Sequence, residues 1–334
     1  METYTRVSAV HKEIVMRKRN VVFLGLSLSI GPWALAATSV IGIVVGQTWT
    51  KADSPYVLVG DVMFTSGTIQ PGVEIQAGGN YTFEIGGIVT IQGTKVEPIL
   101  FTTAPGVEAW QGVLCNRTPG TLELSWVIIE RAQASGLHIV DCAATVRNSI
   151  FRDNVSAAGA GVRIEVTTTA TLDDIVFEDC TIAGNTASRS DGGSAFGGGL
   201  YSGNQRSRTI LSRCLITENA CTVGATGDRY ACGGGVYVFE GRIILVGCQV
   251  THNMCSGAYP EGGALYCVSN GDADLQNCTL ADNALNGYRT YGAAVLTGGT
   301  LQIKDCCIMR NGAYASYSYN GVISIWGGAC TIVN

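Results

Sequence analysis

The chain has 334 residues, of which only 14% are charged and 44 are glycine. Few charges, together with many glycines and β-branched residues, favour short strands joined by tight turns. The net charge of −5 argues against a nucleic-acid-binding protein, and we expect no nucleic-acid partner.

Residues 1–37 have the features of a secretory signal peptide. The basic run Arg17-Lys18-Arg19 precedes the apolar residues 21–35, and the small-x-small sequence Ala34-Leu35-Ala36 follows. Met16 stands directly before the basic run and is a candidate true start. The alternative is an uncleaved membrane anchor, which a second apolar run at 40–45 keeps open. We therefore predict a secreted or cell-surface protein that meets a membrane only through this segment.

Turn signals recur at short intervals in residues 48–113. They are Pro71-Gly72, Gly78-Gly79, Gly86-Gly87 and Gly93-Thr94. Sequences rich in glycine and proline separate short strands. We interpret 48–113 as the N-terminal capping coils of a repeat domain.

One short motif, Cys-x-(Ile/Val/Leu)-x-x-Asn, occurs five times in residues 114–334. Its cysteines are Cys180, Cys214, Cys248, Cys278 and Cys306, at intervals of 34, 34, 30 and 28 residues. A period near 30 with the same positions filled indicates stacked structural repeats. We expect these cysteines to be free thiols at inward positions of a strand, where a thiol acts as a small apolar filler.

The asparagines of the motif form a column of their own. Its members are Asn154, Asn185, Asn219, Asn253, Asn283 and Asn311. Asparagine tolerates a left-handed backbone, and its amide can bond to copies above and below. We predict a buried asparagine ladder at a turn of each coil.

A second column begins with small residues and continues with an aliphatic one. Strand alternation places the aliphatic residues inside; they are Leu137, Val162, Leu200, Val236, Leu265, Val295 and Val322. The residue after each of them faces out. Strands that recur at one period without helical patterning predict an all-β fold, a single-domain solenoid of parallel coils.

Thirteen cysteines in an exported chain raise the question of disulfides. Cys221 and Cys255 each follow a motif cysteine by seven residues, so they should stack on adjacent coils. Cys221 and Cys232 bracket one loop, and the sequence does not choose between the two pairings. With no Cys-x-x-Cys sequence and three histidines, we expect neither a metal site nor a cofactor.

Several segments resemble secreted bacterial right-handed parallel β-helix proteins of the pectin-lyase-like superfamily. They are Gln47–Tyr56, Thr68–Ile75, Pro98–Thr103 and Trp110–Val113. The copies Gly262–Leu265 and Phe151–Asn154 are similar to repeats of polymorphic outer-membrane and autotransporter passenger proteins. The resemblance implies a right-handed parallel β-helix and export. It says little about activity, because this fold carries lyases, hydrolases and adhesins alike.

The enzymes of that superfamily would imply paired aspartates with further histidine and arginine signatures. Asp173-Asp174 is the only adjacent aspartate pair, and the other signatures are missing. Asp179, Asp282 and Asp305 stand where other repeats carry Arg213, Thr251 or Asn277. We therefore predict no catalytic residues.

Tyrosine is the residue that most suggests a binding surface. Tyr201, Tyr237 and Tyr266 share the outward position on three successive coils, where they either stabilise the sheet face or form a platform for sugar rings. The variable connections between the asparagine and glycine columns should emerge along one edge of the solenoid. They add candidate ligand-binding residues Tyr230, Tyr259, Tyr288 and Tyr291, with Tyr314, Tyr317 and Tyr319 further on.

We therefore expect a secreted or cell-surface, adhesin-like structural protein that binds a glycan or protein partner through this tyrosine-rich edge. The alternative is a carbohydrate-active enzyme, a polysaccharide lyase or glycoside hydrolase. Residues 329–334 have the pattern of a strand that enters another coil. A solenoid end needs a cap, so we expect a truncated repeat region, with end-to-end association or a missing C-terminal domain.

Overall fold

The computed structural model describes residues 37–333, apart from 117–120, 168–171, 190, 226, 228 and 320. Residues 1–36, which carry the predicted signal peptide and Met16, lie outside the described residues. Within the described part, the chain forms strands with one short 3-10 turn at Lys51–Asp53. No described helix has the length and apolar character needed to cross a membrane.

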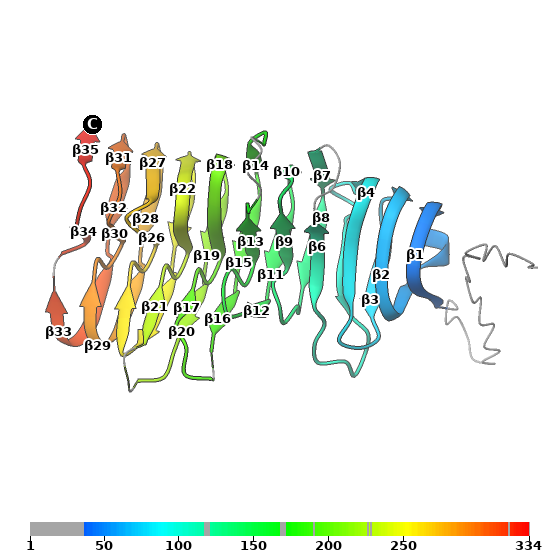
Figure 1. Cartoon of the computed structure of the whole chain (residues 1–334), viewed down its shortest axis with the longest axis horizontal. Coiled ribbons are helices and arrows are strands. Elements are labelled where there is room, and N and C mark those ends of the chain that lie inside the picture. Colours follow the sequence, from blue (N-terminus) through cyan, green and yellow to red (C-terminus); the bar gives the residue numbers. More distant parts are fainter. Residues whose placement is uncertain are drawn as a thin grey trace, which may run out of the picture.

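The strands wind into a row of stacked coils from β1 to β35 (Figure 1). A large sheet of 26 strands runs the length of the row, and a smaller sheet of 9 strands accompanies it from β12 to β33. Corresponding strands of successive coils pair in parallel, for example Leu200 with Val236 and Val236 with Leu265. Residues about thirty positions apart therefore lie directly over one another, as the repeat predicts.

Each coil contributes to three columns of the large sheet. The first column leads to the cysteine position and contains β7 (Thr121–Ser125), β10 (Ala143–Arg147), β14 (Ile175–Glu178), β27 (Gly271–Gln276), β31 (Leu301–Lys304) and β35 (Cys330–Val333). The second column lies between the cysteine and asparagine positions and contains β3 (Glu74–Ala77), β5 (Ile99–Thr103), β8 (Val127–Glu130), β11 (Ile150–Arg152), β15 (Thr181–Ala183), β19 (Leu215–Thr217), β23 (Gln249–Thr251), β28 (Thr279–Ala281) and β32 (Cys307–Met309).

The third column follows the glycine position. It contains β6 (Gly112–Asn116), β9 (Leu137–Val140), β13 (Val162–Glu165), β26 (Leu265–Cys267), β30 (Val295–Thr297) and β34 (Ile323–Ile325). Longer strands continue through more than one column: β1 (Thr38–Trp49), β2 (Tyr56–Ile69), β4 (Thr82–Gln92), β18 (Leu200–Ser212) and β22 (Val236–Val246).

The smaller sheet, called here the outer sheet, is built from the variable connections. Its strands are β12 (Val155–Ser156), β16 (Thr186–Ser188), β17 (Ala195–Phe196), β20 (Ala220–Thr222), β21 (Tyr230–Cys232), β24 (Met254–Gly257), β25 (Tyr259–Glu261), β29 (Ala284–Tyr291) and β33 (Gly312–Tyr319). These connections do emerge together, and they pair with one another rather than remain separate loops.

The asparagine ladder is the best-satisfied polar feature of the interior. Asn219 Oδ1 accepts hydrogen bonds from the backbone N–H and the Nδ2 of Asn185, at 3.1 and 2.9 Å. Asn219 Nδ2 donates to Ile182 O and to Asn253 Oδ1, both at 2.9 Å. All four hydrogen-bonding positions of this buried amide are therefore used, and the predicted ladder is confirmed.

The left-handed backbone lies one residue earlier than predicted. Glu218, His252 and Asp282 have φ values of 57°, 57° and 58°, and each precedes a ladder asparagine. This residue turns the chain, so that the following asparagine side chain points into the core. The asparagine is selected for its amide rather than for its backbone freedom.

The motif cysteines lie at corners rather than within strands, which corrects the prediction. Cys214 stands between β18 and β19, directly after Arg213, whose φ is 53°. The left-handed residue directs the thiol inward, where Cys214 is buried and its Sγ donates to Phe177 O at 3.5 Å. The next thiol lies close above, because Cys214 N donates to Cys248 Sγ at 3.4 Å.

The aliphatic column is inward over most of its length. Leu137, Val162, Leu200, Val236, Leu265 and Val295 are all buried. Val322 is 40% exposed, so its predicted inward position is wrong. Backbone pairing joins Val295 to Ile323 instead, and a shift of one residue turns a side chain to the opposite face.

The described solenoid begins at β1, before the boundary predicted at residue 48. Its first coils are filled by aromatic rings. Trp49 stacks on Tyr56 with 4.3 Å between ring centroids and meets Phe64 edge-on at 5.0 Å. Large rings in this position fill the tube with few side chains.

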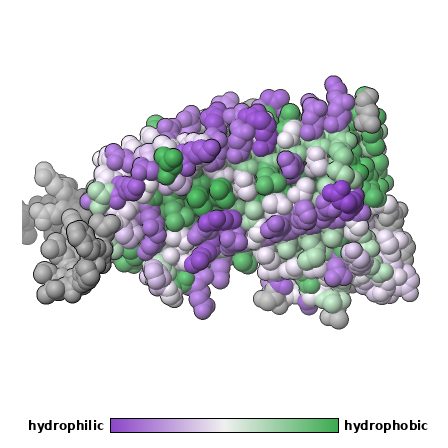
Figure 2. Space-filling model, turned by 180° about the vertical axis from the view of Figure 1, so that it is seen from behind, coloured by the Kyte–Doolittle hydropathy of each residue, from purple (hydrophilic) through white to green (hydrophobic). Residues whose placement is uncertain are grey.

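Hydrophilic side chains run in bands along the outside of the rod (Figure 2). Exposed ion pairs also join neighbouring coils, such as Arg213 with Asp179 at 2.8 Å and Arg310 with Asp282 at 2.7 Å. Exposed pairs of this kind contribute little stability each. The buried ladders are therefore the stronger determinants of coil register.

Replacing Asn219 by alanine should lower the free energy of unfolding by roughly 2–4 kcal/mol, because four buried hydrogen-bonding groups lose their partner. Those groups are the backbone N–H and Nδ2 of Asn185, Ile182 O and Asn253 Oδ1. Urea denaturation followed by circular dichroism measures the loss.

Thr181→Ala is the matched control, since Thr181 lies on the outward face of β15. It should cost less than about 1 kcal/mol. Equal losses for the two variants would show that the ladder does not stabilise the coils.

Candidate functional site

A cavity of about 460 Å³ opens between the third column and the outer sheet. We call it the aromatic pocket. Its lining residues are Phe196, Tyr230, Cys232, Tyr237, Tyr259, Glu261, Tyr266, Arg289, Tyr291 and Trp326. Seven of these ten side chains are aromatic, and the remaining three are polar or ionisable.

The register of the outer sheet explains one wall of the pocket. β21 and β25 pair so that Tyr230 lies over Tyr259 and Cys232 over Glu261. Successive side chains of a strand point to opposite faces, so residues two positions apart face the pocket together. The intervening Ala231 is buried on the other side. The Tyr230 and Tyr259 rings stack at 5.3 Å.

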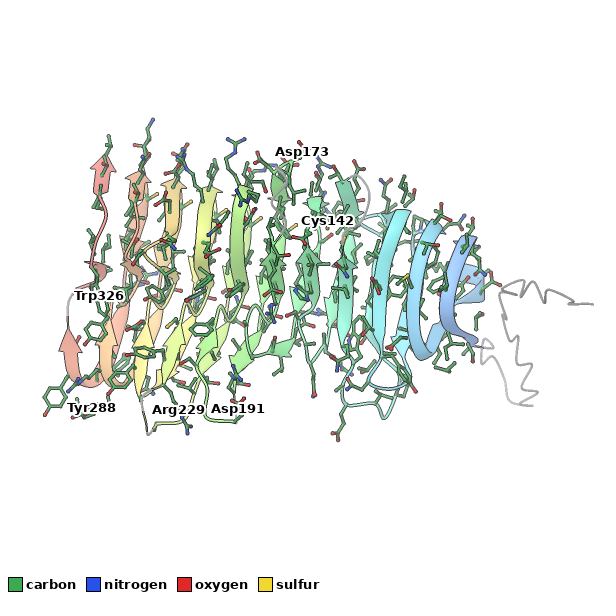
Figure 3. The ribbon with its side chains drawn as sticks, viewed as in Figure 1. Cys142, Asp173, Asp191, Arg229, Tyr288 and Trp326 are labelled. Atoms are coloured by element: carbon green, nitrogen blue, oxygen red, sulfur yellow. The ribbon has the colours of Figure 1, made fainter. Side chains whose placement is uncertain are left out.

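The third column supplies the opposite wall. Tyr237 on β22 and Tyr266 on β26 lie on successive coils, with ring centroids 5.4 Å apart and an interplanar angle of 71°. Tyr201 stacks on Tyr237 from the preceding coil at 5.5 Å and 18°. Trp326, which follows β34, completes the pocket toward the C-terminal coils (Figure 3).

The structure brings most of the sequence-predicted tyrosines together. Five of the seven line the aromatic pocket: Tyr230, Tyr237, Tyr259, Tyr266 and Tyr291. Tyr201 lies behind Tyr237 and outside the lining. Tyr288 lies apart from the pocket, is 46% exposed and packs edge-on against Tyr317 at 5.3 Å.

The outward tyrosines do not form an open platform, which corrects one reading of the sequence. Tyr237 is only 4% exposed. The outer sheet covers this face of the third column, and the Phe196 ring lies 4.9 Å from the Tyr237 ring. The three rings do contact one another in a row, stacked between Tyr201 and Tyr237 and edge-to-face between Tyr237 and Tyr266, but Tyr237 and Tyr266 form the wall of a pocket.

Glu261 is the most perturbed acid of the pocket. Its side chain is 2% exposed, and its Oε2 accepts a hydrogen bond from the Cys232 thiol at 3.5 Å. Its Oε1 is buried and has no hydrogen-bond partner in the described part of the chain. Burial raises the pKa of Glu261 to about 7, and the Cys232 thiol and Tyr266 hydroxyl partly oppose this rise.

Burial also shifts the pKa values of the residues that neighbour Glu261. Burial, together with the nearby Glu261 charge, raises the pKa values of Cys232, Tyr237 and Tyr266. These groups remain protonated at neutral pH, so each has a hydrogen to donate. The pocket therefore places one poorly satisfied carboxyl group among protonated hydroxyls and a thiol.

Arg289 supplies the other unsatisfied polar atom. Its Nε is a buried donor without an acceptor among the described residues. Its guanidinium carbon lies 5.6 Å from the centroid of the Tyr288 ring. No ion pair joins Arg289 to Glu261 within the described chain. An unpaired donor and an unpaired acceptor thus both line the pocket.

The aspartates considered from the sequence lie elsewhere. Asp174, Asp179 and Asp282 pair with Arg208, Arg213 and Arg310 of neighbouring coils. Asp173 lies at the edge of the ribbon opposite Asp191 and Arg229 (Figure 3). Asp305 is exposed at a left-handed corner. None of these acids lines the aromatic pocket.

The structure answers the disulfide question. Cys221 and Cys255 lie directly opposite each other on β20 and β24, as predicted, and both are buried. They and Cys232 are free thiols, so neither candidate bridge is present. Within the described residues, no group of three or more His, Cys, Asp and Glu side chains is placed to hold a metal ion.

Sequence reasoning missed Phe196, Cys232, Glu261, Arg289 and Trp326. A signal for the acid and the thiol was present, because Tyr-x-Cys at 230–232 and Tyr-x-Glu at 259–261 have the same spacing on successive coils. That spacing places both members of each pair on one face of a strand.

The comparisons with known proteins identify the fold. A family described as right handed beta helix region matches residues 111–334, so the chain belongs to this family. The predicted right-handed parallel β-helix is thus confirmed. Export and the likeness to autotransporter passenger proteins remain predictions.

Among solved structures, the chain is similar to one described as the crystal structure of Agl-KA catalytic domain. The two are 10% identical, with a TM-score of 0.28, and the match covers 89% of this chain and 62% of that one. The chain therefore spans less than two thirds of that structure, and a likeness this weak carries no argument about activity. No curated protein matches the chain.

The stability of the protein should fall as the pH rises from about 5 to about 8. The pKa of Glu261 is raised from 4.5 to about 7 in the folded protein, so the folded state keeps a proton that the unfolded chain releases over this interval. The linked loss is on the order of 3 kcal/mol. Urea denaturation at several pH values measures it.

Glu261→Gln should remove this part of the pH dependence and be more stable than the wild type at pH 8. Glu123→Gln, at an exposed position on β7, should keep the wild-type slope. If Glu261→Gln also keeps that slope, the carboxyl group is not held in its protonated form by burial.

Proposed function

We propose that this protein is an exported, adhesin-like carbohydrate-binding β-helix that holds a sugar ring in the aromatic pocket. The observation that carries the proposal is the ring of seven aromatic side chains around one cavity of about 460 Å³. This volume falls within the ~300–1,000 Å³ of ordinary small-molecule sites. The rod-like coils provide a rigid support for such a pocket.

The lining suits a sugar more than an apolar ligand. Aromatic faces pack against the C–H face of a sugar ring, while the hydroxyl groups at the edge of the sugar need hydrogen-bond donors and acceptors. Glu261 and Arg289 offer an unpaired acceptor and an unpaired donor in the same cavity. Tyrosines add contact area at a low cost in conformational entropy.

The rival function is a carbohydrate-active enzyme, and Glu261 gives it a specific basis. A carboxylic acid with a pKa of about 7 suits general acid catalysis at neutral pH. Glycoside hydrolysis generally uses two carboxyl groups across the scissile bond, whereas Glu261 is the one acid among the described lining residues. The lining therefore favours binding over hydrolysis.

Trp326→Ala and Tyr259→Ala should each weaken glycan binding roughly tenfold, because each removes an aromatic contact with the sugar. A glycan array of neutral, acidic and amino oligosaccharides identifies a retained glycan, and calorimetry with that glycan measures the change. Tyr314→Ala is the matched control, because Tyr314 is 74% exposed and lies outside the pocket.

Wild-type protein that retains no glycan on the array would contradict the proposal. Equal weakening by Tyr314→Ala would place binding outside the aromatic pocket. Release of new reducing or unsaturated ends from a bound glycan, abolished in Glu261→Gln, would establish the enzyme instead.

A further inference from the structure

We propose that the sugar held by the aromatic pocket carries a free, protonated amino group, which Glu261 binds as a carboxylate. This inference rests on the proposed carbohydrate-binding function and adds the chemical class of the ligand. Its basis is the placement of one buried carboxyl group, with one unpartnered oxygen, inside a ring of aromatic side chains.

Within the described residues Glu261 has no ion-pair partner, and its neighbours are other residues of the pocket. Cys232 lies beside it on β21, and Tyr291 pairs with it on β29. Tyr266 and Tyr237 face it from the third column, and burial keeps them protonated. The Cys255 thiol bonds to the Glu261 backbone carbonyl and does not reach the carboxylate.

The unpartnered Oε1 of Glu261 determines which chemical group of a ligand it can bind. An ionised carboxylate is costly to bury unless it is both hydrogen-bonded and balanced in charge. The Cys232 thiol supplies a weak hydrogen bond to Oε2 only. A neutral sugar hydroxyl would satisfy Oε1 but would leave the charge unbalanced, whereas an ammonium group does both.

The aromatic rings favour the same ligand. A cation near the face of a tyrosine or tryptophan ring is attracted by the ring's electron density, and the attraction grows when the site excludes water. The cavity places Tyr266, Tyr291 and Trp326 in the same lining as Glu261. The rings and the carboxylate therefore add their attraction for one positive charge.

Arg289 limits the part of the ligand inside the cavity to one cationic group and gives it an orientation. Its guanidinium lies near the Tyr288 ring, and Tyr288 is outside the lining. Its buried Nε is an N–H donor without an acceptor in the described chain. A sugar hydroxyl or ring oxygen is a suitable acceptor, so the amine should point to Glu261 and an oxygen-rich edge to Arg289.

Two oligosaccharides that differ in charge test the proposal. Calorimetry should compare the tetramer of β-1,4-linked glucosamine with its fully N-acetylated counterpart, using the full chain near neutral pH, where Glu261 can ionise and the amine can hold its proton. We expect the amine form to bind at least tenfold more tightly. Glu261→Gln keeps the size of the side chain and should remove that preference.

Glu123→Gln is the control, because it removes the same charge from an exposed position on β7. It should leave the preference intact, and a loss of preference there would assign the effect to the overall negative charge. The circular dichroism spectrum of Glu261→Gln confirms that the variant is folded.

Equal affinity for the two tetramers would overturn this inference and leave the carbohydrate-binding function standing. A preference for the amine that survives in Glu261→Gln would also overturn it. If neither tetramer binds, the inference fails, and the glycan array described above decides the proposed function separately.

Discussion

The architecture depends on the vertical pairing of buried asparagine amides. From Asn185 to Asn283, each ladder amide donates two hydrogen bonds and accepts two, so a coil that shifted by one residue would leave several polar groups unpaired in the core. The thiols at the neighbouring corner and the aliphatic side chains of the third column need only to be small or apolar. The ladder is therefore the feature that most strictly fixes which residue lies over which.

The same register builds the aromatic pocket. Because the coils cannot slip, the connections that leave them begin and end at matching heights, and they pair as the outer sheet. Tyr230 and Tyr259 then stack, and Cys232 comes to lie beside Glu261. The pocket residues lie between positions 196 and 326 of the sequence, and the coil register that stabilises the core also positions them.

The sequence was sufficient for the fold, and five of the seven candidate tyrosines lie in the lining of the aromatic pocket. Period, ladder and inward columns are visible because residues of one kind recur at fixed spacing. Two differences between the structure and the sequence-based predictions have local causes. A residue with a left-handed backbone precedes each motif cysteine and places the cysteine at a corner, and Ile323 rather than Val322 pairs with Val295. The covering of Tyr237 and the burial of Glu261 depend on how variable segments of unequal length fold over the third column. No repeat encodes that packing.

The amides of the ladder all point in one direction, from Asn154 through Asn185 and Asn219 to Asn311. From Asn185 to Asn283, each ladder asparagine therefore donates from its Nδ2 to the next coil and accepts at its Oδ1 from the preceding coil. Duplication or deletion of one complete coil would therefore preserve the direction of the ladder hydrogen bonds. The length of the rod is thus a modular property, and evolution can change its reach separately from the cavity near its later turns.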